Sequence, residues 1–298
     1  TARMTLPAAR RGVQDMPTLP QAASAYAALQ NVVRLEPEDT ESWALGGILL
    51  VDHLGMLEEA VEWWQQRRQV NPEDVTPLIE QIAILVRLGM YSEASELLEI
   101  MFDSEMEQPD RKQLMNMDRV RQMVDKAAKM EKEEIFRPQN PKHPRWEIIG
   151  RMKTRKPLSE TFFLFTFVAP IVFIIGTIAM STLGGSQYGF ILVFLIILGL
   201  FTGVSRAGAG LLQKLNRHAL DLERAIDIEA TSGKVCVPAE IRGSKLYNHT
   251  IGKRTEAFQY RHSKIIESDE IIDKKWKPSL PDFSNTEGWW GDDEESED

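Results

Sequence analysis

The sequence has few of the residues that catalysis and covalent cross-linking require. Its 298 residues contain one cysteine, Cys236, which excludes an internal disulfide. The five histidines, at positions 53, 143, 218, 249 and 262, lack metal-ligand spacing to one another or to the cysteine. No Walker A sequence or G-x-S-x-G elbow occurs. We therefore predict no enzyme, no catalytic residue, no cofactor and no metal site, and we expect His218 to be a surface residue of a helix rather than a pigment ligand.

Two long apolar runs contain no ionisable side chain except Tyr188 at the start of the second. They cover residues 161–180 and 188–204, and each is long enough to cross a hydrocarbon core of about 30 Å, the second only just. Two buried core helices are the alternative. Because neither run contains His, Asp, Glu, Lys or Arg, neither offers a proton path. We predict a two-helix transmembrane hairpin over residues 159–206.

Basic residues flank both runs, whereas the loop between them, residues 181–187, has no charge. By the positive-inside rule, both long flanks face the side of synthesis and only the loop reaches the other side. The basic flanking residues are Arg145, Arg151, Lys153, Arg155, Lys156, Arg206, Lys214, Arg217 and Arg224.

The segment before the apolar runs repeats itself with a period of about 34 residues. Ala25, Ala60 and Ala94 recur 35 and 34 residues apart, and Pro37 and Pro72 are 35 apart. A small Ala lets two helices approach closely, a Gly permits the turn between them, and Pro ends the second helix. The pattern resembles the tetratricopeptide repeat. The first unit has one extra residue between Trp43 and Ala60, which predicts a slightly longer turn.

The inner helices of such an array normally bind the partner. Here one Arg occurs among those positions, too few to clamp a carboxylate, so an apolar or basic client segment fits better. The predicted partner-binding positions are Leu45, Ile48, Asp52, Ile79, Glu80 and Ala83. Residues 36–110 contain 18 acidic against three basic residues. These acidic side chains either only keep the surface of the repeats solvated or recognise a basic segment of a partner.

With the remaining segments, the chain divides into six parts, and we predict a mainly α-helical architecture. We predict a leader remnant at 1–20, which is alternatively a trimmed end, and a repeat domain at 21–136 whose capping helix lies within 110–130. An extended Pro-rich, basic linker is predicted at 137–158, then the hairpin. Residues 207–280 should form a basic helix and a small, irregular mixed domain with short strands near 234–241 and 254–266. An acidic tail covers 281–298.

Two further features suggest contacts with a partner. Gly199, Gly203 and Ala207 form a small-residue face at four-residue spacing, which packs either on the hairpin's own first helix or on a client helix. Trp289 and Trp290 precede six acidic residues in the last seven, which indicates a disordered tail or a docking peptide with two aromatic anchors.

The order of leader, two repeats at 40–107, apolar hairpin and charged C-terminal region resembles the Low Photosystem II Accumulation family of chloroplast membrane proteins, which are assembly and repair factors of photosystem II. The resemblance implies a thylakoid protein with both termini in the stroma. Its expected partners are the nascent D1 subunit, anionic thylakoid lipids and other assembly factors, and no nucleic acid. A membrane-anchored import receptor and a structural subunit of a membrane complex are the alternatives.

Overall fold

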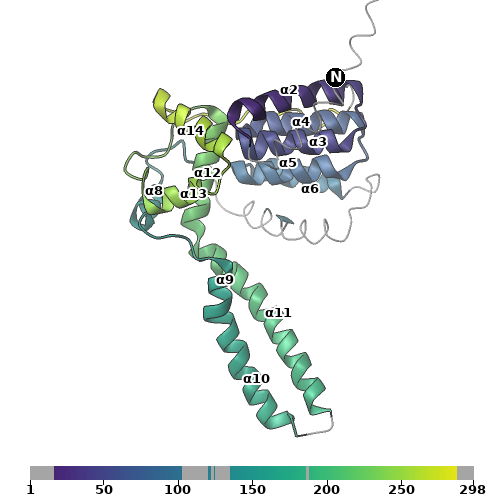
Figure 1. Cartoon of the computed structure of the whole chain (residues 1–298), viewed down its shortest axis with the longest axis vertical. Helices are drawn as coiled ribbons and strands as arrows, with labels where there is room; N and C mark the ends of the chain where they lie inside the picture. Colours follow the sequence, from purple (N-terminus) through teal and green to yellow (C-terminus); the bar gives the residue numbers. More distant parts are fainter. Residues whose placement is uncertain (1–16, 103–119, 122–123, 125–134, 186–187, 287–298) are drawn as a thin grey trace, which may run out of the picture.

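The structure is a computed structural model that describes residues 17–102, 120–121, 124, 135–185 and 188–286. Within these residues it is mainly helical, as predicted, and its extended pairing is limited to one bridge between Val235 and Ile271. Figure 1 shows a stack of helices from the N-terminal half, a cluster of C-terminal helices beside it, and a pair of long helices that projects away from both.

The stack contains α2 to α6 (Figure 1). Their bounds are α2 Leu19–Leu35, α3 Thr40–Ile48, the π-helix η1 Leu49–Leu54, α4 Leu57–Val70, α5 Val75–Leu88 and α6 Tyr91–Met101. Asp39 and Asp74 cap α3 and α5, each accepting a hydrogen bond from a backbone N–H two residues on. Gly55 and Gly89 end η1 and α5 with φ of 65° and 80°, a region that glycine adopts without strain. Equivalent caps therefore recur in two successive helix pairs.

The predicted longer turn in the first pair is wrong. Trp43 precedes Gly55 by 12 residues, whereas the equivalent Leu78 precedes Gly89 by 11. Each of these glycines is nevertheless followed by one residue before the next helix begins. The extra residue is accommodated inside the helix, where Leu49–Leu54 has π-helical bonding.

Close approach of the paired helices depends on the small residues that the repeat pattern singled out. Ala60 and Ala94 are fully buried. A Cβ at Gly47 would lie 2.6 Å from the ring of Trp64, so only glycine fits under this indole. Val124 is also fully buried and packs with the second helix pair, but most of the predicted capping helix lies outside the described residues.

The projecting pair begins with α9 Glu160–Phe163 and η2 Leu164–Val168, continues through α10 Ala169–Leu183, and returns as α11 Gly189–Leu215. The continuous helix Glu160–Leu183 has 24 residues and contains an 18-residue stretch with a mean hydropathy of 2.5, so one helix of the described chain is long and apolar enough to cross a membrane. The apolar part of α11, Gly189–Val204, is shorter. Both helices extend beyond the predicted limits of 161–180 and 188–204.

The two long helices pair along their length. A Cβ at Gly176 would lie 3.1 Å from Ile197, and one at Gly208 would lie 2.8 Å from Phe163. At the base, the side chain of Asn216 both accepts from the N–H and donates to the C=O of Leu158, each at 2.9 Å. Gly208 thus lies opposite the start of the first apolar run. It is four residues beyond the predicted end of the second apolar run, at residue 204.

The C-terminal cluster is more helical than predicted. It contains α12 Arg217–Ser232, α13 Lys245–Ile251 and α14 Glu256–Ser268, with α8 Pro144–Met152 packed on α12. The expected strand near 254–266 is the helix α14, which begins where the Thr255 hydroxyl accepts from the N–H of Phe258. The expected extended linker contains α8, because Pro144 occupies a first-turn position that proline favours. His218 is buried, so its prediction as a surface residue is wrong.

Candidate partner-binding surfaces

The predicted partner-binding positions of the stack divide into exposed and half-buried groups. Ile48 is 40% exposed, and Asp52 and Ala83 are also exposed. Leu45 and Ile79 are half-buried, and both pack against hydrophobic clusters of the stack. The exposed members can contact a partner, whereas these two side chains also support the core.

The acidic members of this face lie close to one arginine. Asp52 is 3.9 Å from the guanidinium of Arg87. Burial, and secondarily the charge of Asp52, raises the pKa of Glu80. Burial alone would lower the pKa of Arg87, but Asp227 and then Asp52 raise it overall. This end of the face is therefore a mixed charged surface rather than a purely acidic one.

Arg87 also joins the stack to the C-terminal cluster. Its Nε and Nη2 donate to the two carboxylate oxygens of Asp227 at 3.2 and 3.1 Å, and Arg254 donates to Asp227 at 2.8 Å. The Asp227 side chain is only 4% exposed. Because a buried carboxylate needs such partners, this ion-pair network fixes α5 on α12.

The π-helix supplies the second part of this junction. Carbonyl oxygens at its end accept hydrogen bonds from C-terminal side chains: Thr255 donates to Asp52 at 2.9 Å and Arg261 donates to Leu54 at 2.8 Å. A Cβ at Gly55 would lie 2.5 Å from the ring of Phe258. The extra residue of the first helix pair thus lies where the C-terminal cluster docks on the stack.

A cavity of about 430 Å³ lies beside this junction, between α5, α6 and α12. Much of its charged lining is already paired. Arg224 donates to the backbone carbonyl of Arg87 at 3.1 Å, and its guanidinium lies 5.4 Å from the ring centre of Tyr91. The cavity therefore belongs to the joint between the stack and the C-terminal cluster.

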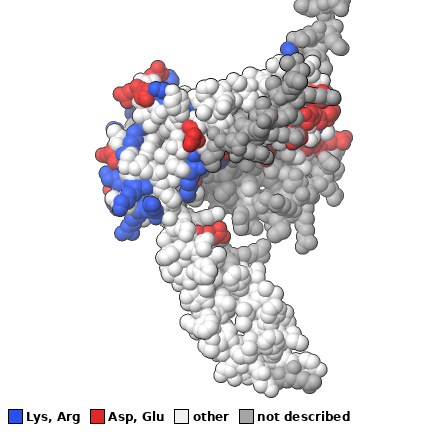
Figure 2. All heavy atoms as spheres, viewed as in Figure 1, with Lys and Arg blue, Asp and Glu red and all other residues white. Residues whose placement is uncertain are grey.

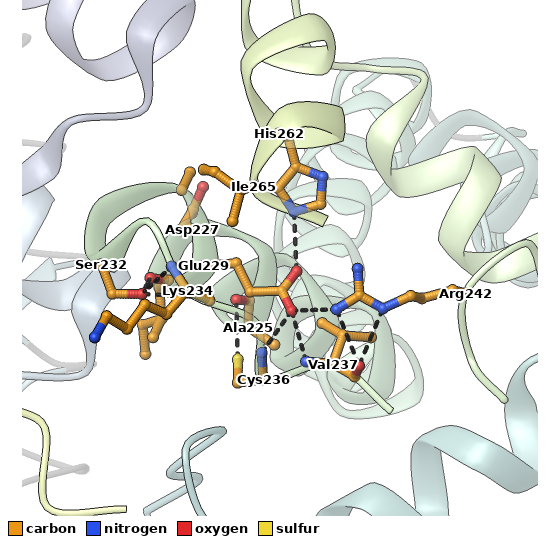
Figure 3. Close-up of polar contacts among 12 residues, drawn as sticks. Ala225, Asp227, Glu229, Ser232, Lys234, Cys236, Val237, Arg242, His262 and Ile265 are labelled. Carbon is orange, nitrogen blue, oxygen red and sulfur yellow. Dashed lines mark hydrogen bonds and ion pairs between the residues drawn. The ribbon is translucent and has the colours of Figure 1, made fainter. Parts of the chain in front are cut away.

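A second buried carboxylate organises the C-terminal cluster itself (Figure 3). Glu229 is fully buried, and its Oε1 accepts from the N–H groups of Cys236 and Val237, both at 2.7 Å, and from Arg242 at 2.6 Å. Its Oε2 lies 2.9 Å from His262 Nε2. Through these contacts Glu229 holds two elements on α12: the loop that follows α12, and helix α14.

Cys236 beside this carboxylate has an unreactive environment. The residue as a whole is half-buried. Its Sγ donates a hydrogen bond to the carbonyl of Ala225 at 3.6 Å. Burial of the sulfur, and then the charge of Glu229, raises the pKa of the thiol well above its ordinary range. A low-pKa nucleophile is not formed here. Within the described part of the chain, no three His, Cys, Asp or Glu side chains are grouped to hold a metal ion.

Basic side chains gather on the C-terminal cluster beside the start of the projecting pair, whereas acidic side chains gather at the far end of the stack (Figure 2). His249 on α13 lies near Lys156 and Lys253, and its pKa is lowered by burial and then by these two charges. Arg151 and Arg155 are exposed in the same connection to the apolar helices. We call these residues the basic collar.

The projecting pair exposes large apolar side chains around its outside. Phe165 and Phe173 are 73% and 75% exposed. Gly199 and Gly203 are exposed too, and a Cβ at either would meet nothing within 4 Å. These two glycines do not pack on the first helix; the close contacts between the two helices are made by Gly176 of α10 against Ile197 and by Gly208 of α11 against Phe163. Ala207 has a helical backbone, but its side chain lies outside what the structure describes, as do Trp289 and Trp290.

The C-terminal segment makes contacts that the sequence did not predict. Residues 276–286 run along the stack, where Leu280 and Phe283 pack against both of its hydrophobic clusters. Gln65 Nε2 donates to the carbonyls of Asp282 and Asn285 at 3.3 and 2.6 Å. Arg68 Nη1 donates to the carbonyl of Phe283 at 3.2 Å. The predicted division at residue 281 thus falls inside an ordered segment bound to the repeat region.

Sequence reasoning missed Asp227, Gln65 and Arg68 because their partners Arg87 and residues 282–285 lie far away in the sequence. It also missed Glu229, although Cys236, Val237 and Arg242 follow it within 13 residues. One signal was available: Asp227 and Glu229 alternate with Ile226 and Ile228 in a helix whose apolar face is otherwise regular.

A scan against protein-family models, a search of curated proteins and a search of solved structures each found no match to this chain.

Proposed function

We propose that this protein is a non-catalytic, membrane-anchored assembly factor. In this proposal, α3 to α6 are two tetratricopeptide units and the projecting pair is a hairpin of two membrane spans. The array binds newly made D1, the reaction-centre subunit of photosystem II, and aids its insertion, assembly or repair at the thylakoid membrane. Both termini face the stroma.

The observation that carries the proposal is the fixed position of an exposed helical face relative to an apolar anchor. The buried Arg87–Asp227–Arg254 network ties the array to α12, and α12 follows α11 after one residue. A face held in this way stays close to the membrane surface. Ile48, Asp52 and Ala83 are then available to a client segment that leaves the bilayer nearby.

The basic collar supports a membrane location. Lys and Arg side chains beside an anionic surface each contribute about 1 kcal/mol of attraction. The collar lies at the end of the projecting pair where Ser159 caps α9 and Asn216 closes the base. Anionic thylakoid lipids would bind there, while the acidic stack would remain away from the lipid surface.

The second span is shorter in its apolar part, but the helix pairing extends it. Phe163, near the start of the first span, is opposite Gly208. The stretch of α11 from Gly189 to Gly208 has 20 residues, or about 30 Å at 1.5 Å per residue. That length is close to the thickness of a hydrocarbon core, and Arg206 falls in the last turn of the stretch.

The open face at Gly199 and Gly203 is the proposed docking line for a client helix. Small residues let helix backbones approach closely in lipid. Replacing both glycines by Leu would leave insertion intact, because Leu is favourable in the core by roughly 0.3 to 0.6 kcal/mol per residue. We expect client copurification to fall while the amount of protein in the membrane stays unchanged.

Chemical crosslinking in mildly solubilised thylakoids tests the proposal. Enrichment of early photosystem II intermediates would support an assembly factor. Capture of soluble precursors would instead indicate an import receptor, and fixed stoichiometry with a mature complex would indicate a structural subunit. Protease added to the stromal side of sealed membranes should also cleave both the array and the C-terminal region, and protection of either would contradict the two-span arrangement.

A further inference from the structure

The C-terminal segment is held on the array mainly through its backbone. Glu58, Gln65 and Arg68 lie along one side of α4 at spacings of seven and three residues, which place them on one helical face. Burial raises the pKa of Glu58, and the nearby backbone of Ser279 partly offsets this effect. Gln65 and Arg68 donate to three backbone carbonyls, those of residues 282, 283 and 285. Residues 282–285 form a turn in which the N–H of Asn285 donates to the carbonyl of Asp282 at 3.2 Å, so Gln65 and Arg68 bind the backbone of a turn.

Three side chains of residues 276–286 provide apolar contacts: Trp276 packs against the cluster of the first helix pair, and Leu280 and Phe283 also pack against that of the second. Leu280 and Phe283 are three residues apart, and both are half-buried against the clusters of the first and second helix pairs. Between and beside them, Ser279, Asp282 and Ser284 are exposed. Proteins commonly bind peptide segments through this combination of backbone hydrogen bonds with a few side-chain anchors.

The groove contains polar groups that the segment leaves unsatisfied. Arg68 is 2% exposed, yet no carboxylate of the described residues lies within ion-pair distance of it, and its Nε has no hydrogen-bond partner. Gln81 Oε1 and Glu58 Oε1 are also buried without partners. Buried polar groups are normally hydrogen-bonded. The segment therefore fits the groove incompletely.

The segment is also attached in a way that permits release. It forms no helix or strand, and its anchors are only half-buried. Among the described residues, no side chain of the segment forms an ion pair with the array. Release of the segment therefore leaves no charged group of the array without an ion-pair partner. Gln65 and Arg68 would then be free to bind another backbone.

From these contacts we infer that the α4 groove is an exchangeable peptide-binding site and that residues 279–285 are its internal ligand. The external ligand is a client segment that turns as residues 282–285 do and carries two apolar side chains three residues apart, in the positions of Leu280 and Phe283. This inference rests on the proposed function, in that the array binds client segments, and it places a second binding surface on α4, away from the face of Ile48 and Ala83. Binding of the client requires release of the C-terminal segment.

A labelled peptide of residues 276–286 tests the exchange. The full chain in detergent micelles is compared with the double variant Leu280→Ser, Phe283→Ser, which lacks both anchors. An internal ligand competes at an effective concentration on the order of 1 mM. The double variant should thus bind the peptide at least about tenfold more tightly than the wild type, as measured by fluorescence anisotropy.

Two controls define the result. The variant Lys277→Ser changes an exposed residue of the same segment and should bind the peptide as weakly as the wild type. A peptide with Ser at both anchor positions should not bind the double variant. Equal peptide affinity in the wild type and the double variant, or equal binding of the anchorless peptide, would overturn the inference.

Hydrogen exchange of the wild type tests the inference without any substitution. Amides of residues 279–285 should exchange at least about tenfold faster than those of α4, because a releasable segment opens without unfolding the array. Exchange of both at one common rate would show that the segment is an integral part of the fold. Neither experiment uses a photosystem subunit, so peptide exchange can succeed while client capture fails, and the reverse.

Discussion

Replacing Asp227 by Asn should loosen the stack from the C-terminal cluster without unfolding either. Asn keeps the size of the side chain but offers one oxygen where Asp227 accepts three hydrogen bonds from Arg87 and Arg254. Hydrogen bonds to charged groups contribute about 1.5 to 3 kcal/mol each. Because the two arginines are 27% and 18% exposed, solvent offsets part of this loss. We expect a net cost of about 2 to 3 kcal/mol, which corresponds to roughly a 30- to 150-fold increase in local opening.

Hydrogen exchange measured by mass spectrometry locates the effect. In Asp227→Asn, amides at the C-terminal end of α5 and near Arg254 should exchange faster, whereas those of α8 should not change. Asp221→Asn is a matched control, because Asp221 is a similarly buried acid of α12 whose partner is Arg145 of α8. It should accelerate exchange in α8 and spare α5. Identical exchange patterns in the two variants would refute the assignment of Asp227 to the junction.

Three further predictions concern single positions. Gly47→Ala places a Cβ against Trp64 and should destabilise the protein by about 1 to 3 kcal/mol, as measured by thermal melting. The control Gly150→Ala adds a Cβ that meets nothing within 4 Å and should leave the melting temperature unchanged. Equal melting temperatures of the two variants would argue against this packing. Cys236 should resist alkylation at pH 8, and rapid labelling of the folded protein would contradict this expectation. Because the pKa of the thiol is raised in the native state, its contribution to stability should be lost as the pH rises above the ordinary thiol value of about 8.5. Burial lowers the pKa of His53, so its contribution to stability should be present above about pH 6.5 and lost on acidification, and His53→Gln should flatten that part of the stability profile.

The sequence predicted those parts of the fold that depend on local periodicity. Recurring Ala and Gly positions located the helix pairs, since Ala60, Ala94 and the turn glycine Gly55 have the same local task in any such pair. The apolar runs located the projecting helices. Their ends were placed too early, because a helix continues until a cap stops it rather than where hydrophobicity ends.

Features set by distant contacts could not be read in this way. The π-helical turn compensates for one extra residue, and a longer loop would have done so equally well on sequence grounds. The segment of α14 is rich in aromatic and β-branched residues such as Phe258 and Ile265, which favour strands, but the Thr255 cap and burial against α12 select a helix. The partners of Glu229 and Arg68 come from segments that only the folded chain brings together.

Site-specific photocrosslinking during D1 synthesis tests the central claim most directly. A photoreactive residue is introduced at Ile48 or Ala83 on the exposed array face, and at Tyr260, an exposed residue of α14, as the control. After a short radioactive pulse, positions 48 and 83 should crosslink to labelled D1, the signal should decline during the chase as D1 enters the mature photosystem, and position 260 should give little product. Equal labelling at all three positions, or a D1 signal that persists through the chase, would contradict an assembly factor that binds its client through this face.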